Sequence, residues 1–306
     1  MGAPDRVEDL AVLPSLAGIY ARQVPSALVG ALPAGPLRRD RTVGSLPGVA
    51  YRASGVRPDA ARLTDFAHLT RAPGSDVLPA GFVHATVFPV AMALMARNDF
   101  PLPLAGLVHL RNRWTQRRPL TLASVLGVTT WAEDLRPHRS GTLVDVVSEI
   151  RDERDGADGA AVAVDRSTYL ARGRFLSGSD RAEGADRTAF TPPVPTGRWR
   201  LGADAGRRFA EVSGDWNPIH ISAPTARLLG MKGAIAHGMY TASRGLATIR
   251  LPEAYAWDVS FAAPVVLPAT VAIRVDGTPQ DADGARFTGW DPRSGRLHLT
   301  ATVTAG

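Results

Sequence analysis

Two short segments in the last third of the chain carry the residues best suited to chemistry. Gly214–His220 reads Gly-Asp-Trp-Asn-Pro-Ile-His, and Ile235–Tyr240 reads Ile-Ala-His-Gly-Met-Tyr. A carboxyl group and an imidazole that share one water molecule can transfer protons in both directions. A glycine N–H at the start of a helix can stabilise negative charge on a carbonyl oxygen. The segments therefore indicate acid–base chemistry beside a carbonyl group.

Each candidate residue also has a plainer interpretation. Asp215 could be a turn residue or a helix cap, and His220 could be a buried histidine with satisfied hydrogen bonds. Asn217 precedes a proline, a common way to start a turn. His237 could pair with the loop or only pack against it. A metal site is not expected here, because a catalytic zinc usually takes three protein ligands and a water.

Length and composition describe an ordinary globular protein with room for two domains. The chain has 306 residues, of which 45% are apolar and 21% charged. It has no cysteine, which excludes disulfides, thiolate metal sites and a cysteine nucleophile. Acidic residues near the amino end argue against a secretory signal, and the apolar stretch 77–96 reads as a buried hairpin followed by a helix rather than a membrane span. A cytoplasmic protein without membrane contact is expected.

The net charge of +6 comes almost entirely from arginine. Scattered arginines are typical of a solvated surface, whereas nucleic-acid-binding proteins usually cluster them on one face. Nucleic-acid binding is therefore not expected. A second interpretation is attraction for an acidic or phosphorylated carrier, such as coenzyme A or an acyl carrier protein.

A weak internal repeat divides the chain into two halves. Asp59-Ala60-Ala61-Arg62 resembles Asp204-Ala205-Gly206-Arg207, and each begins with an acidic helix cap. Gly81–Phe88 resembles Ala234–Tyr240, and each is expected to open a helix, at 89–97 and 240–249. Residues 108–128 match 257–277 without a gap. Period-two patterns then predict strands at 142–150, 161–170, 271–275, 287–290 and 297–303, with hairpin turns at 156–160 and 291–295.

The two halves differ in one important respect. Only the second half has the Gly-Asp-Trp-Asn-Pro-Ile-His segment, whereas the first half has Leu69–Gly74 in that region, without the polar set. We therefore expect the second half to carry the chemistry and the first to contribute shape. Each half is expected to be an α+β unit, an antiparallel sheet wrapped around one long helix.

The paired motif resembles the MaoC-like (R)-specific enoyl-thioester hydratases, whose fold is the hotdog. Two copies in one chain resemble the double-hotdog members, including the 3-hydroxyacyl-thioester dehydratases. The motif resemblance covers about 198–250. The expected organisation is a degenerate hotdog domain with an N-terminal extension over 1–172, a linker over 173–197, and a catalytic MaoC-like hotdog domain over 198–306.

The resemblance implies a hydro-lyase that interconverts (3R)-3-hydroxyacyl and trans-2-enoyl thioesters in fatty-acid or related lipid metabolism. Asp215 and His220 would be the catalytic pair, the Gly238 N–H would hold the thioester oxygen, and Asn217 would shape the loop. Many relatives have an Asp two residues after the histidine, where this chain has Ser222. No cofactor is implied, and a homodimer is compatible with the resemblance.

Two other functions remain open from the sequence. A thioesterase of the same fold would also use a carboxylate and water, but would attack the carbonyl carbon. An acyl-thioester-binding subunit would keep the motif without turnover. The acyl-chain length and the carrier, coenzyme A or acyl carrier protein, also stay open.

Overall fold

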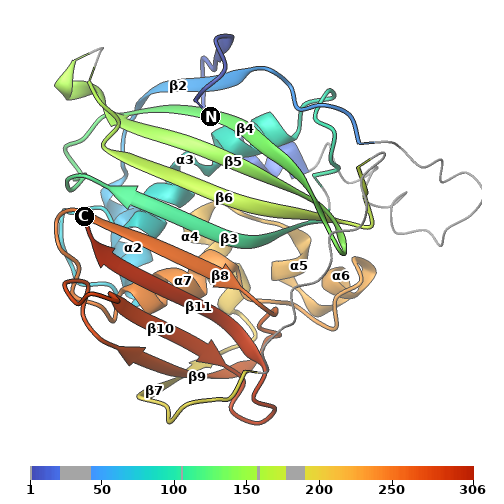
Figure 1. Cartoon of the computed structure of the whole chain (residues 1–306), viewed down its shortest axis with the longest axis vertical. Coiled ribbons are helices and arrows are strands. Elements are labelled where there is room, and N and C mark those ends of the chain that lie inside the picture. Colours follow the sequence, from blue (N-terminus) through green and yellow to red (C-terminus); the bar gives the residue numbers. More distant parts are fainter. Residues whose placement is uncertain (1, 21–42, 105, 157–158, 177–189) are drawn as a thin grey trace, which may run out of the picture.

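The computed structural model describes residues 2–20, 43–104, 106–156, 159–176 and 190–306 (Figure 1). The first half of the chain supplies six strands and two long helices. Its elements are β1 Val7–Asp9, β2 Ala50–Val56, α2 Ala60–Thr70, α3 Ala80–Met95, β3 Leu107–Gln116, β4 Leu126–His138, β5 Gly141–Asp152, the short 3-10 helix η1 Glu153–Asp155, and β6 Ala163–Arg172.

The second half repeats this plan with shorter helices. Between its first strand and its central helix it has two additional short helices, which Figure 1 shows at one end of the molecule. The elements are β7 Gly197–Leu201, α4 Ala205–Ser213, α5 Pro218–Ile221, α6 Ala223–Leu228, α7 Gly238–Leu246, β8 Tyr255–Phe261, β9 Ala269–Asp276, β10 Ala285–Trp290 and β11 Leu297–Ala305.

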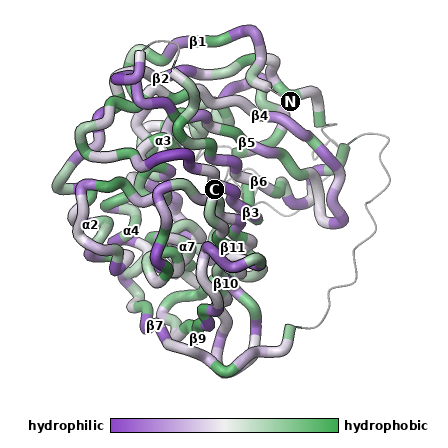
Figure 2. The backbone as a smooth tube through the Cα atoms, turned by 60° about the vertical axis from the view of Figure 1, so that its left-hand side comes forward, coloured by the Kyte–Doolittle hydropathy of each residue, from purple (hydrophilic) through white to green (hydrophobic). Residues whose placement is uncertain are grey.

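All eleven described strands belong to one sheet. Their order is β1-β2-β4-β5-β6-β3-β8-β11-β10-β9-β7. Only β1 and β2 pair in parallel. Figure 2 shows β1 and β2 at one end of the molecule and β7 and β9 at the other. The five strands expected from the sequence are present as β5, β6, β9, β10 and β11.

The two halves meet where β3 pairs antiparallel with β8. At this seam Trp114 lies opposite Trp257, and both side chains are almost fully buried. The main cluster of buried apolar side chains contains residues of both halves. Two antiparallel sheets around helices were expected, and the structure confirms them, but hydrogen bonds across the seam make them one continuous sheet.

Helix α3 corrects one expectation from the sequence. The prediction was a hairpin followed by a helix beginning at Pro89, whereas the helix runs over Ala80–Met95 with Pro89 inside it. Proline has no N–H, so the carbonyl of Ala85 loses its usual partner within the helix. The Arg62 guanidinium donates a hydrogen bond to that carbonyl at 3.1 Å. A side chain from α2 thus compensates for the proline, which a local pattern does not reveal.

The helix starts are partly as expected. Asp59 caps α2, because its carboxylate accepts a hydrogen bond from the Arg62 N–H. Asp204 holds the same position before α4 but makes no such bond, so its predicted capping is wrong. Helix α7 begins at Gly238, two residues before the predicted start, and this places the glycine at the first helical position.

The structure describes the connecting segments only in part. Residues 291–295 form the expected hairpin turn, in which the Gly295 N–H bonds to the Asp291 carbonyl. The predicted turn at 156–160 includes residues 157–158, which lie outside the described residues, and so does the stretch 177–189 of the predicted linker. The domain boundaries therefore stay a prediction. None of the described helices is long and apolar enough to span a membrane.

Asn112 connects the two halves beneath the seam. Its fully buried amide accepts a hydrogen bond from the Trp257 indole N–H at 2.7 Å. The same amide donates to Asp165 at 2.6 Å and to Ser167 at 3.0 Å, both on β6. This one amide gives hydrogen-bond partners to buried groups of both halves. Buried polar groups without partners destabilise a fold, so the amide stabilises the contact between the halves.

We predict that Asn112→Ala lowers the free energy of unfolding by about 2–4 kcal/mol, because it leaves the Trp257 N–H and an oxygen of Asp165 buried without a partner. Urea unfolding followed by tryptophan fluorescence measures the change. Asn98→Ala is the control, since Asn98 is exposed. Equal stability of the two variants would show that the amide does not hold the seam.

Candidate active site

The loop after α4 is shaped by its own residues. Helix α4 ends at Gly214 in the left-handed conformation, with φ of 79°, which glycine adopts without strain. The Asn217 side chain then accepts a hydrogen bond from the Ile219 N–H and caps α5, with Pro218 at its first position. The role expected for Asn217, shaping the loop, agrees with this geometry. Ser222 caps the next helix, α6, through the Thr225 N–H.

His220 lies on α5 and is buried. Its Nδ1–H donates a hydrogen bond to the Ile235 carbonyl at 2.8 Å, which leaves the Nε2 lone pair available in the neutral ring. The backbone of His220 packs directly on α4. A Cβ at Gly206 would lie 2.0 Å from the His220 carbonyl oxygen, so only glycine fits there.

His237 fastens the loop to helix α7. Its Nε2–H donates to the backbone carbonyl of Asp215 at 2.9 Å and lies 3.6 Å from the carboxylate Oδ2. Its ring stacks on His220 with 3.6 Å between the centroids. Of the two interpretations from the sequence, pairing with the loop is therefore the observed one. Side-chain atoms of Asp215, His220 and His237 lie within 4.8 Å of one another.

Gly238 follows at the first position of α7. The first N–H groups of a helix have no acceptor within it, so this amide can bind a ligand oxygen. A Cβ at Gly238 would lie 3.1 Å from the Phe261 ring, so the glycine permits close packing of β8.

The surroundings set the protonation states of these groups. Burial lowers the pKa of His220, and burial together with the neighbouring His220 lowers the pKa of His237 to about 3. Burial acts to raise the pKa of Asp215. The positive charges that His237 and His220 carry when they are protonated, and a hydrogen bond from Tyr20, outweigh it, and the pKa lies below its ordinary value. At neutral pH the site therefore holds a carboxylate and two neutral imidazoles.

Tyr20 is a site residue that the sequence did not reveal. Its hydroxyl donates a hydrogen bond to Asp215 Oδ1 at 2.5 Å, across 195 positions of the chain. Burial raises the pKa of this phenol well above its usual range, so it keeps its proton. Nearby Leu16 is buried, and a Cβ at Gly214 would lie 3.4 Å from it. The N-terminal segment thus packs against the start of the catalytic loop.

Comparison with known proteins identifies the family of the chain. Residues 184–284 match the family described as MaoC like domain. The chain is 36% identical over 285 residues to 3-hydroxyacyl-thioester dehydratase X of Mycobacterium tuberculosis, covering 90% of this chain and 95% of the relative. The chain belongs to the MaoC-like dehydratase family.

Solved structures of MaoC-like dehydratases share the fold over most of the chain. A crystal structure of HtdX from Mycobacterium tuberculosis, 33% identical, superposes with a TM-score of 0.72 and covers 84% of this chain and 100% of its own. A MaoC-like dehydratase from Phytophthora capsici is 17% identical with a TM-score of 0.64, over 87% of this chain and 98% of its own, which shows the shared fold alone. The expected double-hotdog fold is thereby confirmed.

The same three side chains have a spacing that a metal ion could use. One ring nitrogen of each imidazole donates a hydrogen bond to a backbone carbonyl: that of His220 to Ile235 and that of His237 to Asp215. The remaining nitrogen of His237, Nδ1, is buried and has no hydrogen-bond partner within the described part of the chain. Hydrogen bonds of this kind also orient metal-binding histidines, so a site without metal stays a prediction.

The first half of this MaoC-like chain has a histidine–aspartate contact of its own. His84, the counterpart of His237, lies inside α3 and contacts Asp165 on β6 at 2.5 Å. Phe88 stacks on His84, and the cavity beside them measures about 10 Å³, room for at most one water molecule. No acidic loop precedes His84 in the sequence. Its acidic partner comes from a distant strand instead.

We predict that Gly206→Ala lowers kcat/KM by about 100-fold, because the added Cβ must displace the His220 backbone. The rate of a dehydratase assay on an acyl thioester, with circular dichroism to check the fold, measures this. Ala61→Gly is the matched control, since Ala61 holds the equivalent position in the first half and is exposed. It should cost about 0.5–1 kcal/mol of stability and leave the rate unchanged. Similar rates for the Gly206 variant and the native protein would contradict the prediction.

Proposed function

We propose that the protein catalyses the reversible dehydration of (3R)-3-hydroxyacyl thioesters to trans-2-enoyl thioesters. The observation that carries the proposal is the meeting of an ionised carboxyl and a neutral imidazole, supplied by Asp215 and His220. The helix-start amide of Gly238 directly follows His237, whose ring stacks on His220. Family membership supports the same reaction.

The reaction needs three groups, and the chain offers each one. In dehydration, the pair Asp215–His220 removes a proton from Cα, and the electron pair moves toward the thioester oxygen. The Gly238 N–H stabilises the negative charge that collects there. The C3–O bond then breaks, and hydroxide leaves as water with a proton from the pair. The pair ends in the protonation state in which it began, and hydration is the reverse.

The two oxygens of Asp215 have different surroundings. Oδ1 accepts hydrogen bonds from the Tyr20 hydroxyl and from the Asn217 N–H. Oδ2 lies on the His237 side. We assign proton transfer to Oδ2 and orientation to Oδ1, with Tyr20 as a positioning residue. Because Asp215 and His220 act on shared protons, we assign the two transfers to the pair rather than to one member.

The substrate is an acyl thioester carried by coenzyme A or by an acyl carrier protein. Both carriers present the same thioester, and the three groups above act only on that thioester and the two adjacent carbons. A reaction on the carbonyl carbon itself would make the protein a thioesterase. Binding without change of the enoyl group would make it a non-catalytic subunit.

We predict that Asp215→Asn and His220→Ala each lower crotonyl-coenzyme A hydration by at least roughly 100-fold, since each removes one proton-transfer group. Loss of the enoyl absorbance measures hydration, and circular dichroism shows whether the variants fold. Release of free thiol from the native protein would favour the thioesterase. Substrate binding with no absorbance change would favour the non-catalytic subunit.

We predict that Tyr20→Phe shifts the acidic limb of the pH–rate profile to higher pH. The hydrogen bond from Tyr20 lowers the pKa of Asp215, so its loss raises that pKa, and the carboxylate is protonated earlier as the pH falls. The profile of kcat/KM against pH measures the shift. Tyr51→Phe serves as a control, because Tyr51 bonds to Arg97 away from the site. An unmoved acidic limb would exclude the positioning role.

A further inference from the structure

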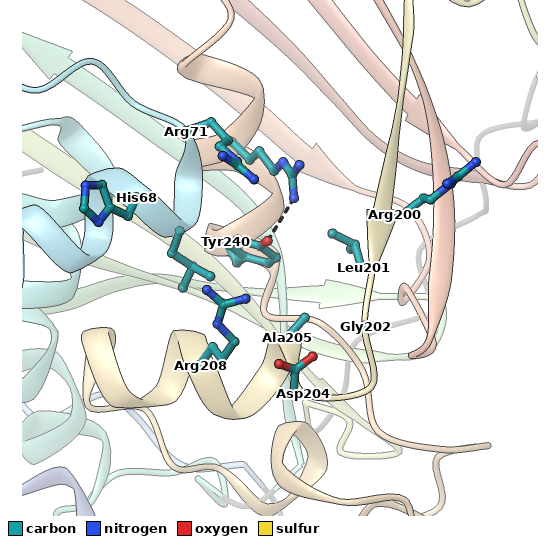
Figure 3. A pocket seen from close by; sticks show the side chains of 11 residues that line it. His68, Arg71, Arg200, Leu201, Gly202, Asp204, Ala205, Arg208 and Tyr240 are labelled. Carbon is teal, nitrogen blue, oxygen red and sulfur yellow. Dashed lines mark hydrogen bonds between the residues drawn. The ribbon is translucent and has the colours of Figure 1, made fainter.

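A further pocket lies beside α4 and α7, at the end of α4 remote from Asp215. It is formed by the end of α2, strand β7, the start of α4 and the first two turns of α7, and it encloses about 130 Å³ (Figure 3). Helix α4 leads from this pocket to Asp215, and α7 leads back to it from Gly238. The lining includes four arginines: Arg71, Arg200, Arg208 and Arg244.

On the described lining of this pocket, positively charged side chains outnumber negatively charged ones. Asp204 is the one carboxylate on its lining. Among the described residues, none of the four arginines forms an ion pair. Other arginines of the chain, such as Arg97 and Arg154, contact carboxylates closely. A concave site with several unpaired guanidinium groups favours an anion with several oxygens.

One of the arginines, Arg244, is held in place before any ligand arrives. The Arg244 guanidinium lies over the Trp199 ring, 5.1 Å from its centroid, and donates to the Tyr240 hydroxyl at 3.0 Å. Its Nε is buried and has no partner in the described part of the chain. Arg71 ends α2 in the left-handed conformation, with φ of 65°, which costs free energy for a residue with a side chain. In Figure 3, Arg71 and Arg208 lie on opposite sides of Tyr240, and Arg200 extends away from them.

The start of helix α4 adds to this positive field. Gly202, Asp204 and Ala205 line the pocket, and the Ala205 N–H already donates a hydrogen bond to the Gly202 carbonyl. The contribution of the helix is therefore the positive end of its dipole, which the Asp204 charge opposes.

We propose that this pocket binds a phosphate group with two negative charges. The shared chemistry allows two sources, namely a phosphate of the coenzyme A thioester or a free phosphate ion. The first source rests on the function proposed above, whereas phosphate binding itself does not. Tyr240 also packs on Phe209, which packs on His237, so an occupied pocket contacts the catalytic group through two rings.

Titration calorimetry with inorganic phosphate tests the site directly. We expect the native protein to bind phosphate, and Arg71→Gln and Arg208→Gln each to weaken binding roughly tenfold or more, because each removes a charge-assisted hydrogen bond. Arg198→Gln is the control, since Arg198 is an exposed arginine on β7 outside the lining, and it should bind like the native protein. Absence of binding, or equal binding by all variants, would overturn the proposal.

Kinetics then identify the source of the phosphate. If the substrate supplies it, Arg71→Gln and Arg208→Gln raise KM for crotonyl-coenzyme A but not for crotonyl-pantetheine, which lacks phosphate. If free phosphate is the ligand, neither KM changes while the calorimetric loss remains. Failure of the native protein to hydrate either thioester would reject the proposed function and leave the calorimetric result standing.

Discussion

The active site depends on two hydrogen bonds in which an imidazole N–H holds a backbone carbonyl. His220 bonds to Ile235, and His237 bonds back to Asp215, so each of two segments is fixed by a histidine from the other. These bonds also set the tautomers, and therefore decide which nitrogen of His220 can accept a proton. Position and chemical state come from the same contacts. A shift of the loop would change both together.

The two halves of the sheet contribute unequally to this arrangement. The second half supplies the catalytic groups, but the seam between β3 and β8 brings both halves into one core. The first half adds a buried polar network around Asp165 and Asn112 that reaches Trp257 across the seam. The N-terminal segment adds Tyr20. A hotdog half without its own catalytic loop can thus still help to position the half that carries the catalytic groups.

Local patterns predicted much of this structure, and distant contacts account for what they missed. The turn at Asn217 and the five strands β5, β6, β9, β10 and β11 follow from residues a few positions apart, so their spacing was informative. The start of α3 was missed because a guanidinium from another helix compensates for Pro89. Tyr20 and the Asp165 partner of His84 lie far along the chain from the groups they contact, and no periodicity indicates such pairs.

The contrast between positions 61 and 206 limits how the catalytic loop could be transplanted. The buried glycine of α4 touches the carbonyl of α5, whereas the exposed alanine of α2 has no such helix above it. A half that has lost its catalytic loop can accept an alanine at the position of Gly206. After that change, the methyl group blocks the place that the loop backbone would occupy. Engineering a second reactive centre into the first half would therefore have to begin by removing that methyl group, before any acid or imidazole is introduced.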